Sequence, residues 1–335
     1  MTDHLRVEPT RPDDPFFVVG CARSGTTLLS VMLDRHPELA VTRETHFINK
    51  ALPYLRMARR THEAQVDCLL ATPLMADLEM DREGLLDCFR RHPCEPSWLL
   101  KAVLETHGRG VGVERVGEKT PMHLEYTRLL YRWFPDARVV GIVRDGRDVA
   151  QSLMHVDWVH NDLMAHAARW VQQSRIARRL ARRHARRFLL VRYEDLLAEP
   201  RETLSRVDAF LGVAFDERQL DPEAGGTEVF SRREISWKNQ AAKALDRDRI
   251  AAWKRGTDAG TLERLNAVMR PELVAHGYPE ARRTLRLTRR GLGLWLHAAH
   301  AHYRHRRMKA RDVVRWHARS TLGRLGVRNK AIRPG

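Results

Sequence analysis

Short apolar runs alternate along this chain with longer stretches in which apolar and polar residues recur at helical spacing. The clearest runs are Phe16–Val19, Leu39–Thr42, Arg138–Val143 and Phe188–Val191. Their length and their content of β-branched residues are typical of buried strands. A weaker run, Val116–Pro121, indicates a short strand or a turn. Because helical stretches separate the runs, the strands are expected to lie in parallel in one sheet.

The predicted helices are bounded by prolines, glycines and capping residues. They fall at Thr27–Arg35, Pro121–Trp133, Val149–His155, Asp162–Arg186, Pro200–Leu211, Arg249–Trp253 and Gly260–His276. Thr120 is expected to cap the helix that begins at Pro121. Residues 50–115 are irregularly helical and indicate an insertion that could shape an acceptor pocket. The expected fold is therefore α/β, a three-layer α/β/α domain over residues 16–280 with a central, mostly parallel sheet.

Charge is distributed unevenly, which adds a separate C-terminal segment to this domain. The formal net charge is +17, and residues 281–335 contain 16 Lys and Arg against a single acid, Asp312. This tail therefore carries +15, and apolar residues interleave with its arginines. The composition is typical of an amphipathic helix on an anionic membrane surface. A basic helix packed on the body, a disordered tail and, least favoured, non-specific nucleic-acid binding are the alternatives.

The remaining composition indicates a cytoplasmic protein. Residues 1–15 are polar and lack a signal-peptide pattern. The apolar stretch Gly291–Ala299 is too short to span a bilayer. The four cysteines have no metal-ligand spacing and are expected to be reduced, with a Cys88–Cys94 pair left open. No metal is expected, and the sequence does not indicate an oligomeric state.

Candidate chemistry begins directly after the first strand, in the segment Gly20-Cys21-Ala22-Arg23-Ser24-Gly25-Thr26-Thr27. A glycine loop that opens a helix directs free N–H groups at an anion. The spacing is P-loop-like, but Thr26 stands where a nucleotide P-loop has its lysine. That lysine draws the β- and γ-phosphates of a nucleoside triphosphate into line. Its absence favours a ligand without a γ-phosphate.

A second anion-binding candidate follows the strand that ends at Val143. Arg144-Asp145-Gly146-Arg147 comes at the carboxyl end of that strand, and Ser152 lies eight residues after Arg144. Since the carboxyl ends of parallel strands share one edge, Arg144 is expected near the glycine loop. A guanidinium and a hydroxyl suit a second phosphate group. Surface pairing of Arg144 with Asp145 or Asp148 is the alternative.

These two motifs together resemble those of the sulfotransferases that use 3′-phosphoadenosine 5′-phosphosulfate (PAPS). The tyrosylprotein sulfotransferase type is the most similar branch, because its ordered landmarks match Glu44-Thr45, Lys119, Arg144-Asp145-Gly146-Arg147 and Tyr193-Glu194 over about residues 16–278. The resemblance implies that the cofactor is bound by Arg23, Ser24, Gly25, Thr26, Thr27, Arg144, Ser152 and Tyr193. It also implies a late serine that assists the reaction, for which Ser236 is the first candidate and Ser231 the second.

The implied activity is transfer of a sulfuryl group from PAPS to an acceptor hydroxyl by in-line displacement, leaving 3′,5′-adenosine bisphosphate. Glu44 is the candidate base, with His46 as its rival. Lys119, assisted by Arg23, is the candidate for stabilising charge on the leaving oxygen. A Glu44 that caps a helix or forms a salt bridge with Arg43, and a Lys119 that is solvated at the start of a helix, are the alternatives to these roles.

Several alternatives remain open for the chain as a whole. The acceptor could be a peptide tyrosine or a carbohydrate, lipid or small-molecule hydroxyl. A P-loop kinase of nucleotides or small molecules and a non-catalytic basic adaptor on membrane or nucleic acid are the other function classes.

Overall fold

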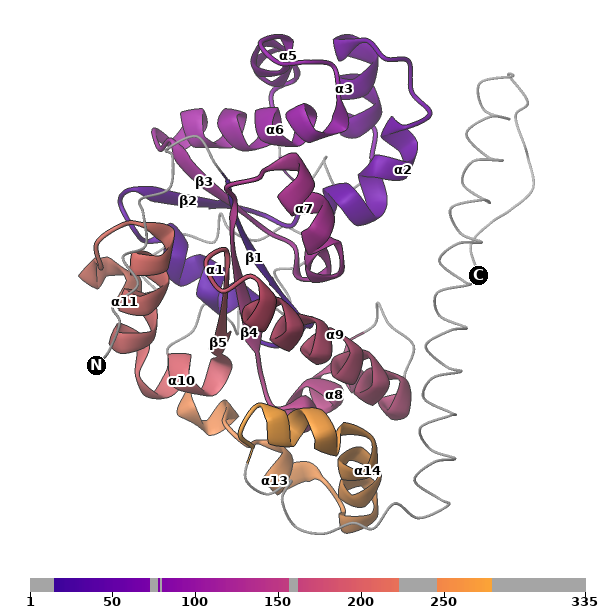
Figure 1. Cartoon of the computed structure of the whole chain (residues 1–335), viewed down its shortest axis with the longest axis vertical. Helices are drawn as coiled ribbons and strands as arrows, with labels where there is room; N and C mark the ends of the chain where they lie inside the picture. The colour runs from indigo at the N-terminus through magenta and orange to yellow at the C-terminus, as the bar shows by residue number, and fades with distance from the viewer. Residues whose placement is uncertain (1–14, 73–77, 79, 157–161, 223–245, 279–335) are drawn as a thin grey trace, which may run out of the picture.

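A five-stranded parallel sheet forms the centre of the molecule (Figure 1). The computed structural model describes residues 15–72, 78, 80–156, 162–222 and 246–278. The strands lie side by side in the order β2-β3-β1-β4-β5. Their bounds are β1 Phe16–Gly20, β2 Leu39–Thr42, β3 Arg115–Lys119, β4 Arg138–Val143 and β5 Phe188–Arg192. The first strand is therefore central, and the loops that follow β1, β3 and β4 meet at one edge.

Helices connect the strands and cover both faces of the sheet (Figure 1). The helices that follow β1, β3, β4 and β5 are α1 Thr26–Asp34, the 3₁₀ helix η2 Pro121–Tyr126, α7 Thr127–Trp133, α8 Gly146–Met154, α9 Leu163–Arg183, α10 Tyr193–Ala198, α11 Pro200–Leu211 and the 3₁₀ helix η3 Glu217–Leu220. The last part of the described chain forms the 3₁₀ helix η5 Arg247–Arg249, α13 Trp253–Gly256 and α14 Ala259–Ala275.

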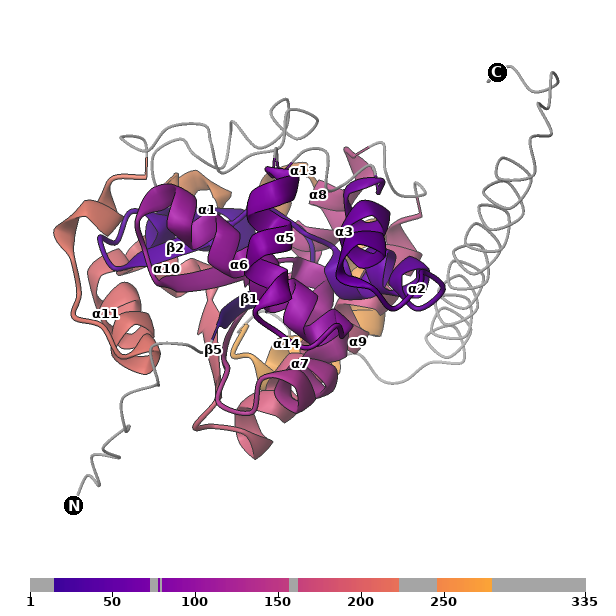
Figure 2. The same ribbon diagram turned by 90° about the horizontal axis from the view of Figure 1, so that it is seen from above.

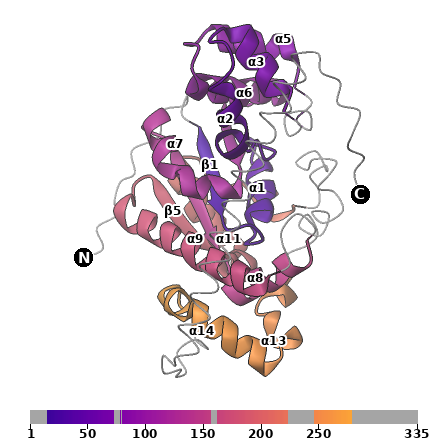
Figure 3. The same ribbon diagram turned by 90° about the vertical axis from the view of Figure 1, so that its right-hand side faces the viewer.

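Residues between β2 and β3 form the predicted helical insertion. It comprises the π-helix η1 Phe47–Ala51, α2 Leu52–Leu55, α3 His62–Leu70, α5 Arg82–Arg90 and α6 Pro96–Val111. Helices α3, α5 and α6 lie at one end of the molecule in Figure 1, and in Figure 2, seen from that end, they lie in front of the sheet. Figure 3 shows α13 and α14 at the opposite end, with the sheet between the two groups.

The alternation of β1 explains the three layers. Phe17 and Val19 join a core cluster with η1, α2, α3, α5 and α6, whereas Phe16 and Val18 join a second cluster with α1, α10 and α11. Successive strand residues point to opposite faces, so both faces of β1 are apolar and fully covered. This confirms the predicted α/β/α architecture.

Two local predictions are wrong. Thr120 does not cap the following helix through its side chain, because its hydroxyl bonds to the Glu118 carboxylate. The predicted helix Arg249–Trp253 is divided into η5 and α13, because Ala251 has φ +52° and the Trp253 N–H bonds to Asp148 instead of to a helix carbonyl.

Other predictions concern parts of the chain that the structure leaves undescribed. Ser231, Ser236 and the tail 281–335 lie outside the described residues, as does most of the loop 225–246. All four cysteines are described and form no disulfide bond with one another. Within the described ranges, no helix has both the length and the apolar content that crossing a bilayer requires.

Candidate active site

The loop between β1 and α1 has a backbone conformation and a packing that favour glycine at position 25. Gly25 has φ +96°, and a Cβ added to it would lie 2.3 Å from Cδ2 of Tyr193. Arg23 also has a positive φ, +70°. The Ser24 hydroxyl is fully buried and has no hydrogen-bond partner among the described residues. A tight left-handed turn, a helix start without a side-chain cap and an unpartnered buried hydroxyl fit an anionic ligand.

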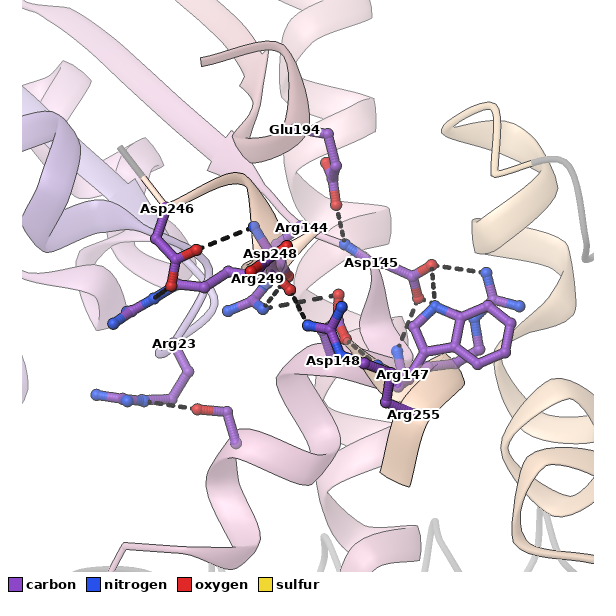
Figure 4. Close-up of polar contacts among 12 residues, drawn as sticks. Arg23, Arg144, Asp145, Arg147, Asp148, Glu194, Asp246, Asp248, Arg249 and Arg255 are labelled. Atoms are coloured by element: carbon purple, nitrogen blue, oxygen red, sulfur yellow. Dashed lines mark hydrogen bonds and ion pairs between the residues drawn. The ribbon is translucent and has the colours of Figure 1, made fainter. Parts of the chain in front are cut away.

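Arg144 is fixed beside this loop by three contacts, of which Figure 4 draws those with Arg249 and Asp148. Its guanidinium carbon lies 4.7 Å from the centroid of the Tyr193 ring, and its Nη2 donates to the carbonyl oxygen of Arg249 at 2.8 Å. The same nitrogen lies 3.6 Å from Asp148 Oδ2. Of the two pairings considered for Arg144, only that with Asp148 exists, because Asp145 binds Arg147. The buried Arg144 Nε has no partner in the described part of the chain, which leaves a donor for a ligand.

Three arginines from distant parts of the chain converge at this point (Figure 4). Arg23 Nε donates to Ser152 Oγ at 3.0 Å, which joins the two predicted anion-binding motifs directly. Burial, followed by the charges of Arg144 and Arg249, lowers the pKa of Arg23. Arg249 Nε lies 3.3 Å from Asp246 Oδ2. Because neighbouring cations disfavour one another's charge, this cluster favours a ligand that carries more than one negative charge.

A second group, Glu44, His46 and Lys119, assembles where β2 and β3 end. Lys119 Nζ donates to Glu44 Oε1 at 2.8 Å, and His46 Nε2 lies 3.1 Å from Glu44 Oε2. The Lys119 side chain is fully buried, whereas that of Glu44 is 13% exposed. A solvated Lys119 is therefore wrong. The two candidate bases are direct neighbours, and the Glu44 carboxylate contacts both the Lys119 ammonium and the His46 imidazole.

The fully buried Glu118 holds this second group in place. Its Oε1 accepts hydrogen bonds from the Thr45 hydroxyl at 2.8 Å and from the Thr120 hydroxyl, and its Oε2 lies 2.9 Å from His123 Nδ1. Burial raises the pKa of Glu118, but the charge of His123 and these hydrogen bonds outweigh it and lower the pKa overall. Glu118 thus ties the loop that carries Glu44 to the strand that carries Lys119.

Other titratable groups near the loop are less suited to chemistry. Burial raises the pKa of the Cys21 thiol to about 12, so this cysteine is a protonated packing residue and not a nucleophile. Among the residues that the structure describes, no group of three or more His, Cys, Asp or Glu is placed to hold a metal ion.

Comparison with known proteins assigns this chain to a family. A model described as "Sulfotransferase family" matches residues 15–217. The chain belongs to the sulfotransferase family. This sulfotransferase is 26% identical to Protein-tyrosine sulfotransferase 1 of Danio rerio over 272 residues, which cover 78% of this chain and 71% of the relative. It is 24% identical to Protein-tyrosine sulfotransferase 2 of Gallus gallus over 288 residues, which cover 83% and 72%.

The fold has a counterpart among solved structures. The sulfotransferase domain of the olefin synthase from Synechococcus PCC 7002 superposes with a TM-score of 0.57 at 22% identity, covering 84% of this chain and 98% of that domain. The comparisons confirm the predicted family, its tyrosylprotein-like branch, the fold and the assignment as an enzyme. They set aside the kinase and the non-catalytic adaptor.

The predicted site residues fall into two groups that the structure brings to one edge of the sheet. Around the glycine loop, Arg23 contacts Ser152 and Arg144 contacts Tyr193. Beside it, Glu44 contacts both Lys119 and His46. Sequence reasoning missed Arg249. Nothing in its neighbourhood, Asp246-Arg247-Asp248-Arg249, distinguishes this arginine from a solvated one.

Proposed function

We propose that this sulfotransferase uses PAPS as its donor and transfers the sulfuryl group to an acceptor hydroxyl by in-line displacement. The observation that carries the proposal is the convergence of Arg23, Arg144 and Arg249 on a glycine loop with an unpartnered buried hydroxyl. PAPS carries a 5′-phosphosulfate and a separate 3′-phosphate. Two anionic groups on one nucleoside match two adjoining anion-binding motifs.

Each motif supplies a different end of the donor site in this proposal. The N–H groups at the start of α1, with the hydroxyls of Ser24, Thr26 and Thr27, would hold the 5′ side. Arg144, through its unpartnered Nε, and Ser152 would hold the 3′-phosphate. Tyr193 packs between Gly25 and the Arg144 guanidinium, so it would set the spacing between the two ends.

Glu44 and Lys119 carry the proposed chemistry. When bound, the donor supplies an activated sulfuryl group, and attack on its sulfur requires the acceptor oxygen to lose a proton. Glu44 is the base that takes this proton, an effect that typically contributes about 10²–10⁴-fold to a rate. The buried Lys119 ammonium offsets negative charge near the reacting atoms. His46, in contact with Glu44, is the rival base. Ser236 is retained as the candidate for the assisting serine.

The acceptor class is the least defined part of the proposal. The relatives named protein-tyrosine sulfotransferases make a peptide tyrosine the first acceptor to test. Carbohydrate, lipid and small-molecule hydroxyls are the alternatives. The insertion between β2 and β3 would line the acceptor side and decide between them. A cytoplasmic location stays a prediction, which cell fractionation of the full chain would test.

Sulfate transfer can be measured directly. PAPS carrying ³⁵S is incubated with the full chain and with panels of tyrosine peptides, glycans, lipids and phenolic small molecules, without added metal. The proposal expects label transfer to at least one hydroxyl acceptor in wild type and loss of transfer in Glu44→Gln. Transfer that is unchanged in Glu44→Gln would refute the assigned base, and failure to transfer to any class would refute the proposed reaction.

A further inference from the structure

Residues 246–257 form a strap that crosses the loop after β4, and the structure describes them as a connected segment. The strap lies beyond residue 217, where the family match ends. Its central residue, Trp253, is 5% exposed although it belongs to a helix of only four residues. Such a short helix has little stability of its own. Contacts with the rest of the chain must therefore hold the strap in place, and the hydrogen bonds of Trp253 are buried, whereas those of Arg247 and Thr257 are partly buried or exposed.

Trp253 binds two carboxylates, that of Asp145, which directly precedes α8, and that of Asp148 in the first turn of α8. Its backbone N–H donates to Asp148 Oδ1 at 2.8 Å, and its indole Nε1–H donates to Asp145 Oδ2 at 3.2 Å. The Arg147 guanidinium carbon lies 3.9 Å from the centroid of the indole ring, and Arg147 Nη2 donates to Asp145 Oδ2 at 2.6 Å. The side chains of Asp145, Arg147 and Asp148 are nearly or fully buried. The indole therefore stabilises the buried Asp145–Arg147 pair, because it stacks on the guanidinium and bonds to the carboxylate.

The strap also determines where Arg144 points. Arg144 Nη2 donates to the carbonyl oxygen of Arg249, which belongs to the strap, and lies near Asp148 Oδ2. The other oxygen of Asp148 is occupied by the Trp253 N–H. Two of the three contacts that fix the Arg144 guanidinium therefore either come from the strap or depend on it, and only the stack on Tyr193 does not.

We propose that Trp253 is a positioning residue for the donor site: by clamping the strap onto Asp145, Arg147 and Asp148, it holds Arg144 in the orientation that receives the donor's 3′-phosphate. The inference rests on the proposed function, because it assigns the 3′-phosphate to Arg144. Donor binding and strap docking are then linked. A ligand that binds Arg144 only in the docked state stabilises the strap, and loss of the strap weakens that ligand.

The test uses the full chain and 3′,5′-adenosine bisphosphate in isothermal titration calorimetry. Trp253→Phe keeps a ring over Arg147 but removes the N–H to Asp145, and Trp253→Ala removes both contacts. We expect Trp253→Ala to raise the dissociation constant about tenfold or more and Trp253→Phe to raise it less. A change of about tenfold is within the usual range for coupled neighbours. Trp98→Ala, in the insertion helix α6, is the matched tryptophan control and should bind as wild type does.

A double-mutant cycle separates positioning from general destabilisation. In an Arg144→Ala background, Trp253→Ala should change the dissociation constant less than about twofold, because the group that it positions is gone. Hydrogen exchange provides a second readout: the peptide that covers residues 246–257 should gain protection when the bisphosphate binds wild type and not when it binds Arg144→Ala.

The outcomes distinguish this inference from the proposed function. Wild type that fails to bind the bisphosphate refutes the proposed donor. If wild type binds the bisphosphate and both Trp253→Phe and Trp253→Ala bind it as tightly as wild type, the clamp is refuted and the proposed donor is not. Equal losses from Trp253→Ala in the wild-type and Arg144→Ala backgrounds would also refute it, since the effect would then not pass through Arg144. If Trp253→Ala does not fold, Trp253→Phe decides between these results.

Discussion

Gly25→Ala tests whether the glycine loop is shaped by the ring of Tyr193. The substitution meets two obstacles. An alanine at φ +96° is strained by about 1–2 kcal/mol. In addition, its Cβ would lie 2.3 Å from Tyr193 Cδ2 and 2.9 Å from Cε2, distances that require the ring to move. Overpacking of this kind typically costs about 1–3 kcal/mol, so the variant should lose about 2–5 kcal/mol of unfolding free energy.

Gly112→Ala is a matched control that isolates the contact with Tyr193. Gly112 ends α6 with φ +72°, and a Cβ added there meets no atom within 4 Å. This variant should lose only the backbone strain of about 1–2 kcal/mol. The Tyr193 ring carries the Arg144 guanidinium at 4.7 Å. Displacing the ring in Gly25→Ala should therefore also weaken 3′,5′-adenosine bisphosphate, while Gly112→Ala binds it as wild type does.

Urea unfolding and calorimetry on the two variants measure both effects. A Tyr193→Ala background should reduce the stability loss from Gly25→Ala to the value seen for Gly112→Ala, because the clash is removed. Equal stability losses for Gly25→Ala and Gly112→Ala with Tyr193 present would refute the reasoning. Unchanged bisphosphate affinity in Gly25→Ala would refute the link between the ring and Arg144.

Three further predictions address the base, a buried acid and the tail. Glu44→Gln should lower kcat about 10²-fold or more and leave bisphosphate affinity unchanged, whereas His46→Gln should lower it less; the reverse order in steady-state kinetics would make His46 the base. Burial raises the pKa of Asp208 to about 6, and its Oδ2 has no hydrogen-bond partner among the described residues. The protonated carboxyl therefore stabilises the folded state, and the free energy of unfolding should fall as the pH rises from about 4 to 6. Asp208→Asn should therefore stabilise the fold at pH 7.5 by on the order of 1–2 kcal/mol and flatten this pH dependence; urea melts in which the variant is no more stable than wild type at pH 7.5 would contradict it. Removal of residues 281–335 should abolish flotation with phosphatidylserine liposomes and leave bisphosphate binding intact; flotation that persists without the tail would contradict its proposed membrane role.

Local patterns predicted the strands and the glycine loop well. Phe16–Val19 is apolar on both faces because it is central in the sheet, and this gives a continuous run that is visible in sequence. Arg144 follows an equally clear strand. Parallel strands deliver their carboxyl ends to one edge, so the proximity of Arg144 and the glycine loop followed from the fold class alone.

Contacts that depend on strand order could not be predicted in this way. Glu118 bonds to Thr45 because β3 lies next to β2, and nothing local in Val116–Pro121 indicates that neighbour. The same residue prevents Thr120 from capping its helix, since the hydroxyl turns back to the carboxylate. A buried carboxylate in a short apolar segment is a sequence signal for such a network, but it does not identify the partners.

The strap was missed for a different reason. Arg249 and Trp253 are predicted to lie in one short helix, but the left-handed Ala251 separates them into two elements. The hydrogen bonds that stabilise this break in the helix are accepted by Asp145 and Asp148, about a hundred residues earlier in the chain. Long-range hydrogen bonds outweigh local helix propensity at this position.

The central claim is that the convergent arginines and the glycine loop form a site for a nucleotide with a 3′-phosphate and no γ-phosphate. Calorimetry of the full chain tests it most directly, with 3′,5′-adenosine bisphosphate titrated without Mg²⁺ and Mg·ATP titrated in a parallel run with Mg²⁺, each against wild type and Arg144→Ala. The account predicts that wild type binds the bisphosphate far more tightly than Mg·ATP and that Arg144→Ala loses most of this preference. Tighter binding of Mg·ATP by wild type, or equal bisphosphate affinity in Arg144→Ala, would contradict it.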